Sequence, residues 1–230
     1  MPREETNEIL QMAERWYGHG EWNARFWFIG PEPGMAQTEG PSLVRRYGAW
    51  REAGGKDLVD CRTYHEKLNI LDWHRPNARL QPTWRKLIRL LLSFQGFRGQ
   101  ELSRERILSY QRCRWGRDRE DTCVVELSSL AANNARVLRD RATFLGQRVE
   151  FLREKIRQCK PMFVIMYGRG QLQYWEQIAG GAFDDEGMRE VGTTVVLTTM
   201  HPVARRVCNQ DWERFGESLQ TRCANTPRTG

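Results

Sequence analysis

Four short apolar runs, separated by longer segments with helical spacing, limit most strictly what this chain can fold into. The runs are residues 26–29, 123–127, 162–167 and 195–197. Continuous apolar runs of this length are typical of strands that are buried on both faces of a sheet. Helices are expected around them, over residues 4–16, 82–92, 134–158, 171–178 and 211–223. Strands that alternate with helices predict an α/β fold with one mostly parallel central sheet covered by helices on both faces.

The organisation of the chain indicates one unit. Its 230 residues fit a single domain, and no linker, low-complexity tract or internal repeat divides them, so residues 1–230 are expected to form one domain. Residues 35–60 contain several glycines, and this composition predicts irregular loops. No apolar run approaches the length of a membrane span, and the first residues lack a signal-peptide pattern. We therefore expect a cytoplasmic protein that makes no membrane contact and acts as a monomer.

The charge balance favours nucleic acid as a partner. The net charge is +7, and arginine outnumbers lysine by 31 to 5. Arginine forks onto phosphate oxygens and stacks on bases, so this balance suits a protein that binds DNA. An arginine bias that only reflects genome composition is the alternative, and the charge alone does not decide between the two.

The cysteines and three of the four histidines show no pattern of a metal or redox centre. None of the six cysteines forms a Cys-x-x-Cys pair, and no cluster of cysteine and histidine has the spacing of a zinc site. Disulfides are not expected without a secretory signal. We therefore expect reduced, structural thiols, no metal and no organic cofactor. His19, His65 and His74 do not lie in a sequence motif that indicates a function, and we expect them to be structural or surface residues.

Two loops that directly follow predicted strands carry the residues most suited to chemistry. They read Gly30-Pro31-Glu32-Pro33-Gly34-Met35-Ala36-Gln37-Thr38 and Met200-His201-Pro202-Val203-Ala204-Arg205. In an open α/β sheet, the loops at the carboxyl ends of the strands form the ligand crevice. One carboxylate, Glu32, and one imidazole, His201, are therefore expected in the same crevice. This is a candidate active site.

Both loops resemble the signature loops of the uracil-DNA glycosylase superfamily. They are most similar to the single-strand-selective monofunctional branch, in which the first loop reads Gly-Met-Asn-Pro-Gly and then Met-Ala-Gln-Thr-Gly, and the second reads His-Pro-Ser-Pro-Arg. The matching residues are Gly30, Pro33, Gly34, residues 35–38, His201, Pro202 and Arg205. The resemblance extends over roughly residues 24–222. It implies a monofunctional DNA glycosylase, which flips a base out of DNA and hydrolyses its N-glycosidic bond.

The resemblance also implies catalytic roles for Glu32 and His201. Glu32 stands where the similar branch has an asparagine that positions the attacking water. A carboxylate there can orient or deprotonate water and stabilise a cation-like sugar. His201 would lie at the floor of the pocket and stabilise negative charge on the departing base. The alternatives are a solvated loop glutamate and a histidine that caps a helix or bonds within the core. Neither loop contains a lysine, so a Schiff-base lyase step is not expected.

A base pocket is expected around the first loop and at the end of the strand at residues 123–127. Glu126 replaces an asparagine that reads the flipped pyrimidine in relatives, and an ionised glutamate only accepts hydrogen bonds, so it favours an amino group over the uracil carbonyl. Ser42 replaces a stacking phenylalanine and leaves a wider pocket, in which Tyr47 or Trp50 can stack instead. The expected base-binding residues are Gly30, Pro31, Gly34, Met35, Ser42, Tyr47 and Glu126. They predict a bulky, amino-bearing cytosine, as found in phage DNA, as the favoured substrate. A strand-end glutamate that points to solvent is the alternative for Glu126.

Basic residues near the second loop are expected to contact DNA. Arg205, Arg206 and Val207 stand where relatives carry the loop that wedges into the duplex and fills the gap left by the flipped nucleotide. Arg169, directly after Gly168, is expected to reach a phosphate beside a helix start. A basic loop in solvent is the alternative interpretation.

Three functions remain open on the sequence. The first is a DNA glycosylase that removes a modified cytosine in defence against phage, or, as a variant of it, a uracil or hypoxanthine repair glycosylase. The second is a non-catalytic protein that binds and shields abasic or damaged DNA. The third is a nucleotide-binding protein that acts on small molecules, but the chain has neither a Gly-x-Gly-x-x-Gly motif nor a P-loop.

Overall fold

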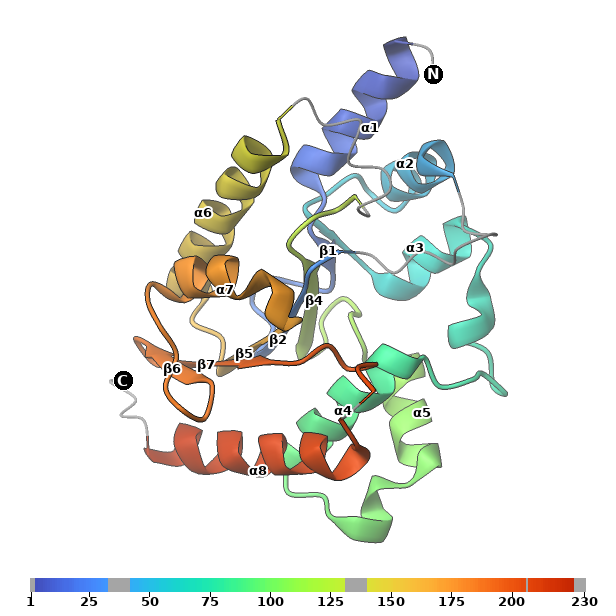
Figure 1. Ribbon diagram of the computed structural model, residues 1–230. Coiled ribbons are helices and arrows are strands. Elements are labelled where there is room, and N and C mark those ends of the chain that lie inside the picture. The colour runs from blue at the N-terminus through green and yellow to red at the C-terminus, as the bar shows by residue number, and fades with distance from the viewer. Residues whose placement is uncertain (1–2, 33–41, 131–139, 206, 226–230) are drawn as a thin grey trace.

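The computed structural model of the chain describes residues 3–32, 42–130, 140–205 and 207–225, and these form an α/β fold (Figure 1). In this part of the chain, a seven-stranded sheet has the order β3-β1-β4-β2-β5-β7-β6. Its strands are β1 (Gly18–His19), β2 (Phe26–Gly30), β3 (Leu58–Val59), β4 (Thr122–Glu126), β5 (Phe163–Tyr167), β6 (Met188–Val191) and β7 (Thr194–Thr199). The central strands β4, β2, β5 and β7 are parallel, β1 is antiparallel to β4, and β6 is antiparallel to β7. The predicted fold class is confirmed.

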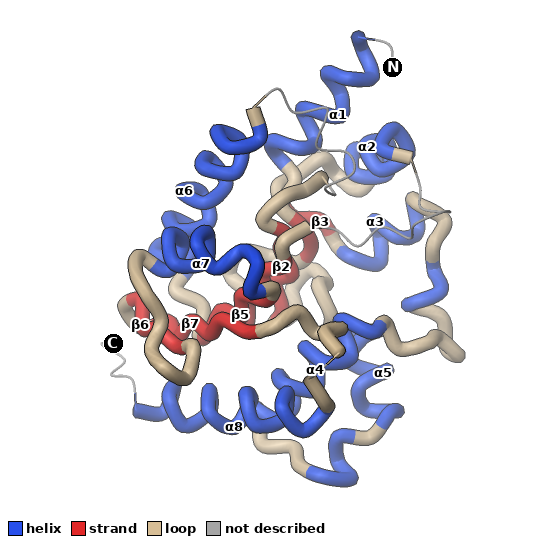
Figure 2. Tube along the Cα trace, viewed as in Figure 1, coloured by secondary structure: helices blue, strands red, loops and turns tan. Residues whose placement is uncertain are grey.

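Helices cover both faces of the sheet, as Figure 2 shows. One face packs against α1 (Arg3–Arg15), α2 (Leu43–Glu52), α3 (Cys61–Lys67), α6 (Arg141–Cys159) and α7 (Leu172–Ala179). The other packs against α4 (Pro82–Phe94), α5 (Arg104–Cys113) and α8 (Asn209–Asn225). Short 3-10 helices lie at η1 (Leu71–Trp73), η2 (Gly99–Leu102) and η4 (Arg169–Gln171).

The alternation of side chains along β2 explains the two layers. Trp27 and Ile29 belong to the core beneath α1 and α6, whereas Phe26 and Phe28 belong to the core beneath α4 and α8. All four side chains are at most 2% exposed. A strand buried on both faces has no polar side, which is why its sequence reads as an uninterrupted apolar run.

Two expectations about local structure differ from the fold observed. Residues 35–60, predicted to be irregular, contain α2, which begins after Ser42; the Ser42 hydroxyl accepts a hydrogen bond from the Arg45 amide (3.3 Å) and caps the helix. The helix expected to start near residue 134 is α6, which begins at Arg141 after the capping residue Asp140. Residues 131–139 lie outside the described part of the chain. The sequence patterns also gave no indication of α3, α5 or the short strands β1, β3 and β6.

The carboxyl ends of the central strands meet at one edge of the sheet, where the two signature loops begin. Gly30 at the end of β2 pairs with Glu126 at the end of β4. The pairing continues beyond the strands, since the Leu127 amide donates to the Gly30 carbonyl (2.7 Å) and the Ser128 amide donates to the Pro31 carbonyl (2.9 Å). These bonds fix the first loop relative to the end of β4. None of the described helices is both long enough and apolar enough to cross a membrane.

Candidate active site

Three adjacent strands present a row of residues at their carboxyl ends. Glu126 of β4, Gly30 of β2 and Tyr167 of β5 are lateral neighbours, because Gly30 pairs with Glu126 and the preceding residues Ile29 and Met166 are paired between β2 and β5. A Cβ atom at Gly30 would lie 2.6 Å from Glu126 Oε2 and would also overlap the Tyr167 hydroxyl. The absence of a side chain at Gly30 therefore lets the carboxylate and the phenol approach each other.

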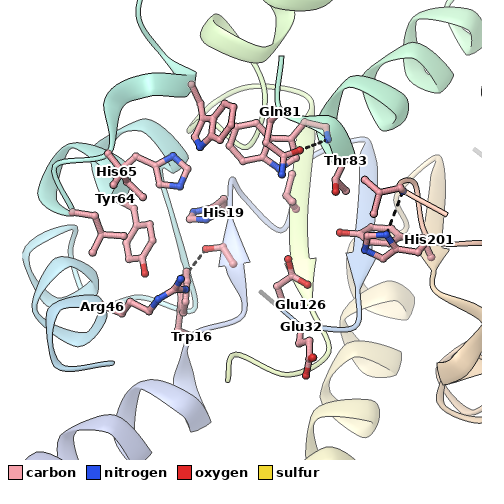
Figure 3. A pocket seen from close by; sticks show the side chains of 18 residues that line it. Trp16, His19, Glu32, Arg46, Tyr64, His65, Gln81, Thr83, Glu126 and His201 are labelled. Atoms are coloured by element: carbon pink, nitrogen blue, oxygen red, sulfur yellow. Dashed lines mark hydrogen bonds between the residues drawn. The ribbon is translucent and has the colours of Figure 1, made fainter. Parts of the chain in front are cut away.

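A cavity of about 380 Å³ opens above this row, a size within the range of small-molecule binding sites. Glu32, Glu126, Tyr167 and His201 all line it, although they come from the ends of four different strands (Figure 3). The other lining residues include Trp16, His19, Arg46, Tyr64, His65, Gln81, Thr83, Trp84 and Val203. The structure thus brings together the acid and the imidazole that the two loops predicted for one crevice.

Glu32 lies two residues beyond β2, on the segment tied to β4 by the backbone bonds described above. Its side chain is 31% exposed, and its Oε2 is 3.5 Å from a guanidinium nitrogen of Arg141 at the start of α6. Because both partners are partly exposed, this ion pair contributes little to stability. The carboxylate is therefore held near the cavity while it remains accessible to water.

His201 lies two residues beyond β7 and has a defined tautomer. The Val203 amide donates a hydrogen bond to His201 Nδ1 (3.3 Å), so Nδ1 is the acceptor and the ring proton is on Nε2. Burial lowers the pKa of His201, which keeps the imidazole neutral near pH 7. The ring also meets Tyr167 edge to face, with centroids 5.4 Å apart. His201 can therefore act as a neutral hydrogen-bond donor through Nε2, which has no hydrogen-bond partner among the described residues.

Glu126 is half-buried, and its Oε2 is shielded from solvent without a hydrogen-bond partner in the described part of the chain. The pKa of Glu126 is raised to about 8, chiefly by burial; within this net shift the guanidinium groups of Arg148 and Arg46 lower the pKa and Glu32 raises it. Most of the carboxyl is then protonated at pH 7, so it can donate as well as accept a hydrogen bond. This corrects the expectation of a group that only accepts.

Arg148 of α6 fixes the backbone beneath Glu126. It is 2% exposed, and its guanidinium donates to the carbonyls of Ala13, Trp16, Glu126 and Leu127 at 2.6–3.2 Å. The group also lies 3.8 Å from the ring centroid of Tyr17. Arg148 therefore connects the end of α1 with the end of β4, and sequence reasoning gave no sign of this because each partner is a backbone carbonyl.

The other predicted base-binding residues have different places. Ser42 is exposed and caps α2, and Tyr47 donates its hydroxyl to Gln11 Oε1 (3.3 Å), so neither lines the cavity. Pro31 lies beside Gly168 at the end of β5. Gly34 and Met35 are outside the described residues. The aromatic side chains that do line the cavity are Trp16, Tyr64, Tyr167, Trp73 and Trp84, and sequence reasoning selected none of them for stacking.

The predicted wedge loop is arranged differently from the expectation. Val207 is half-buried against the core beneath α4, and its carbonyl accepts a hydrogen bond from Lys86 Nζ (2.5 Å), so it is not free to enter DNA. Val203 is instead 55% exposed at the cavity, and Arg205 is exposed two residues later. Arg206 lies outside the described residues. Val203 and Arg205 are therefore the side chains of this loop that the structure leaves exposed.

Arg169 lies away from the cavity that contains His201. It is exposed in η4 and borders a second cavity of about 620 Å³ between β7, α7 and α8. Carboxylates also line this second cavity, from Glu176, Asp184, Asp185 and Glu186. Their negative charge opposes a phosphate, which argues against the phosphate contact expected for Arg169.

No model of a known protein family matches the chain, and no curated protein sequence does. The resemblance of the two loops to the uracil-DNA glycosylase superfamily therefore stays a prediction, and function is inferred from the residues of the site.

Proposed function

We propose that the protein is a monofunctional DNA glycosylase that flips a modified cytosine into the 380 Å³ cavity and hydrolyses its N-glycosidic bond. The observation that carries the proposal is the convergence of Glu32, Glu126 and His201 on one cavity at the carboxyl ends of β2, β4 and β7. A carboxylate open to water, a neutral imidazole donor and a buried base-reading group are the three parts that this hydrolysis needs. DNA is the proposed partner, and the net charge of +7 favours it.

The proposed mechanism divides the chemistry between Glu32 and His201. As the bond between base and sugar breaks, positive charge develops on the deoxyribose and negative charge develops on the base. The Glu32 carboxylate stabilises the first charge and orients the water that attacks the sugar carbon. His201 Nε2–H donates a hydrogen bond to an oxygen of the departing base and stabilises the second charge. The products are an abasic site and the free base, and no group of the protein becomes covalently attached.

The side of the cavity beyond the catalytic residues favours a substituent on the base. Arg46 lies there beside the ring of Tyr64, on the wall opposite His201, as Figure 3 shows. Arg46 Nε is shielded from solvent and has no hydrogen-bond partner among the described residues. Buried polar atoms of a folded protein are nearly always paired, so an unpaired one at a cavity points to a polar ligand. Hydroxyl groups on a modified cytosine would supply such a partner, whereas plain cytosine would not.

A substrate panel tests the proposal. Uracil, hypoxanthine, cytosine, hydroxymethylcytosine and glucosylated hydroxymethylcytosine are placed in otherwise identical DNA, and abasic sites are detected by cleavage with alkali. We expect the glucosylated base to be released fastest. Arg46→Met should slow its release by roughly one to two orders of magnitude, which corresponds to one lost hydrogen bond, and should spare uracil. Preference for uracil in the wild type would instead support a repair glycosylase.

Base choice should depend on pH through Glu126. Because burial raises the pKa of Glu126 to about 8, the carboxyl changes from mainly protonated at pH 7 to mainly ionised at pH 9. The ionised form accepts a hydrogen bond from an amino group but repels a carbonyl at the same place. We therefore expect the ratio of modified-cytosine to uracil release to rise between pH 7 and pH 9, by up to about tenfold.

Amide variants provide the control for this pH dependence. Glu126→Gln has nearly the same shape but does not titrate, so its ratio should stay constant over the same pH range. Glu126→Asn should shift preference towards uracil, because an amide can turn its donor to the carbonyl. If the wild-type and Glu126→Gln ratios change in parallel, or if Glu126→Asn leaves base choice unchanged, Glu126 does not read the base.

A further inference from the structure

One wall of the cavity contains a cluster of metal-binding side chains that the proposed glycosidic chemistry does not use. His19 comes from β1, and Cys61 and His65 come from successive turns of α3. One potential ligand atom from each residue lies within 4.8 Å of the other two. Figure 3 shows His19 and His65 side by side, on the wall away from His201. A Cys-x-x-x-His pair on one helix places both side chains on the same face, but α3 was not predicted, and the sequence spacing alone indicated no zinc site.

The distances in this cluster are close to those of a tetrahedral site. Cys61 Sγ is 3.8 Å from His65 Nδ1, and His74 Nε2 is 2.8 Å from the same nitrogen. With zinc–sulfur and zinc–nitrogen bonds of about 2.3 and 2.0–2.1 Å, two ligand atoms of one ion lie roughly 3.3–3.6 Å apart. The two distances lie on either side of this range, and the ligand atom of His19 is within 4.8 Å of those of Cys61 and His65, so side-chain shifts on metal binding would place the four donors around one ion.

Burial and the backbone at Gly116 hold the side chains of this cluster close together. Cys61, His65 and His74 are 0%, 8% and 5% exposed. Gly116, in the left-handed region with φ +60°, allows His19 and Cys61 to approach, since a Cβ there would lie 3.0 Å from the His19 Cβ and 3.2 Å from the Cys61 Cβ. The Gly116 carbonyl also accepts a hydrogen bond from the Cys61 amide (2.9 Å).

The hydrogen bonds of the cluster are incomplete without a ligand. His19 Nδ1 and His74 Nδ1 are both shielded from solvent and have no hydrogen-bond partner among the described residues. A purely structural histidine network would be expected to pair these nitrogens. A metal ion would replace the direct contact between His65 Nδ1 and His74 Nε2 with a bond from the ion to each nitrogen.

We propose that His19, Cys61 and His65, with His74 as the fourth ligand, bind a Zn²⁺ ion that fastens α3 and the end of η1 to β1. One thiolate and three imidazoles form a donor set that suits zinc, and a four-ligand set is typical of a structural rather than a catalytic ion. Cys61 must release its proton on binding, because the thiolate is the form of cysteine that binds the ion. The ion would stabilise the wall formed by His19, Tyr64 and His65 and would take no part in cleavage of the glycosidic bond.

Cobalt titration tests this site. The full-length protein is treated with a chelator, shown to remain folded by circular dichroism, and titrated with Co²⁺ alone. We expect one ion per chain, with a thiolate-to-cobalt charge-transfer band and the intense visible bands of tetrahedral coordination, all displaced by Zn²⁺. Results with the wild-type protein alone can overturn the proposal. If Co²⁺ does not bind, or if it binds without the thiolate charge-transfer band, Cys61 is not a metal ligand. Refolding that requires Zn²⁺ after chelation would also support it.

Variants locate the ligands. Cys61→Ser should abolish the charge-transfer band, whereas the matched control Cys113→Ser, at an exposed position on α5, should leave it unchanged. His74→Gln should weaken Zn²⁺ binding by about 10–100-fold, which also tests the site if Cys61→Ser does not fold. A band that persists in Cys61→Ser would overturn the assignment. Failure of the zinc site would leave the proposed glycosylase reaction unaffected, and base release measured separately distinguishes the two.

Discussion

Replacement of Glu32 by glutamine should reduce base release by about two to four orders of magnitude, the usual contribution of a catalytic acid or base. Glutamine keeps the size of the side chain but removes the negative charge that stabilises the sugar cation and orients water. Glu32→Ala should abolish measurable cleavage of every base in the panel. The measurement is single-turnover release of the base from DNA, with enzyme in excess, so that product release does not mask the chemical step.

Two controls separate catalysis from stability and from DNA binding. Arg141→Gln removes the ion pair with Glu32 but keeps the carboxylate. Because both partners of that pair are partly exposed, the variant should lower the free energy of unfolding by less than about 1 kcal/mol. It should lower the rate of base release by less than about tenfold. Glu32→Gln should bind substrate DNA as tightly as the wild type. If neither the wild type nor Glu32→Gln releases any base, while both bind abasic DNA tightly, the protein is a binder of damaged DNA and not a glycosylase.

The central sheet could be predicted from the sequence because its strands are buried on both faces. The apolar runs at β2, β4, β5 and β7 have no polar face, and the long helices between them carry an obvious apolar stripe. The two-residue strands β1 and β3 could not be found in this way. They are too short for a periodic pattern, and they form only because the sheet beside them supplies hydrogen-bond partners.

Some residues of the candidate site could be predicted from the sequence, as the central sheet could, and others could not. Glu126 ends a strand, and Glu32 and His201 each lie two residues beyond one, so the rule that strand ends form the crevice was sufficient to place them together. Tyr167 also ends a strand, but its apolar ring reads as core. Ser42 was assigned to the pocket by alignment with a stacking residue, whereas its hydroxyl caps α2. Contacts between distant segments, such as those of His19 with α3, leave no local pattern.

Replacement of Arg148 by methionine should lower the free energy of unfolding by about 3–5 kcal/mol. This is the largest effect on stability that we expect from a single substitution in this protein. Arg148 is 2% exposed and donates to four backbone carbonyls, so methionine fills part of the space but leaves those acceptors without the donor. The melting temperature should fall by roughly 10 °C for a chain of this size. Thermal and urea unfolding followed by circular dichroism provide the measurement.

The shape of the side chain, and not only its charge, should determine this effect. Arg148→Lys keeps a cation, but its ammonium group is compact. It cannot reach all four of the backbone carbonyls that the guanidinium group contacts, those of Ala13, Trp16, Glu126 and Leu127. We therefore expect Arg148→Lys to recover only a minor part of the stability lost in Arg148→Met. Arg157→Met, at an exposed position of the same helix, should change stability by no more than about 0.5 kcal/mol. Because Arg148 holds the carbonyl of Glu126 itself, Arg148→Lys should also weaken the preference for modified cytosine at temperatures where it remains folded. Wild-type stability in Arg148→Lys would show that the charge alone suffices and that the fork does not position β4.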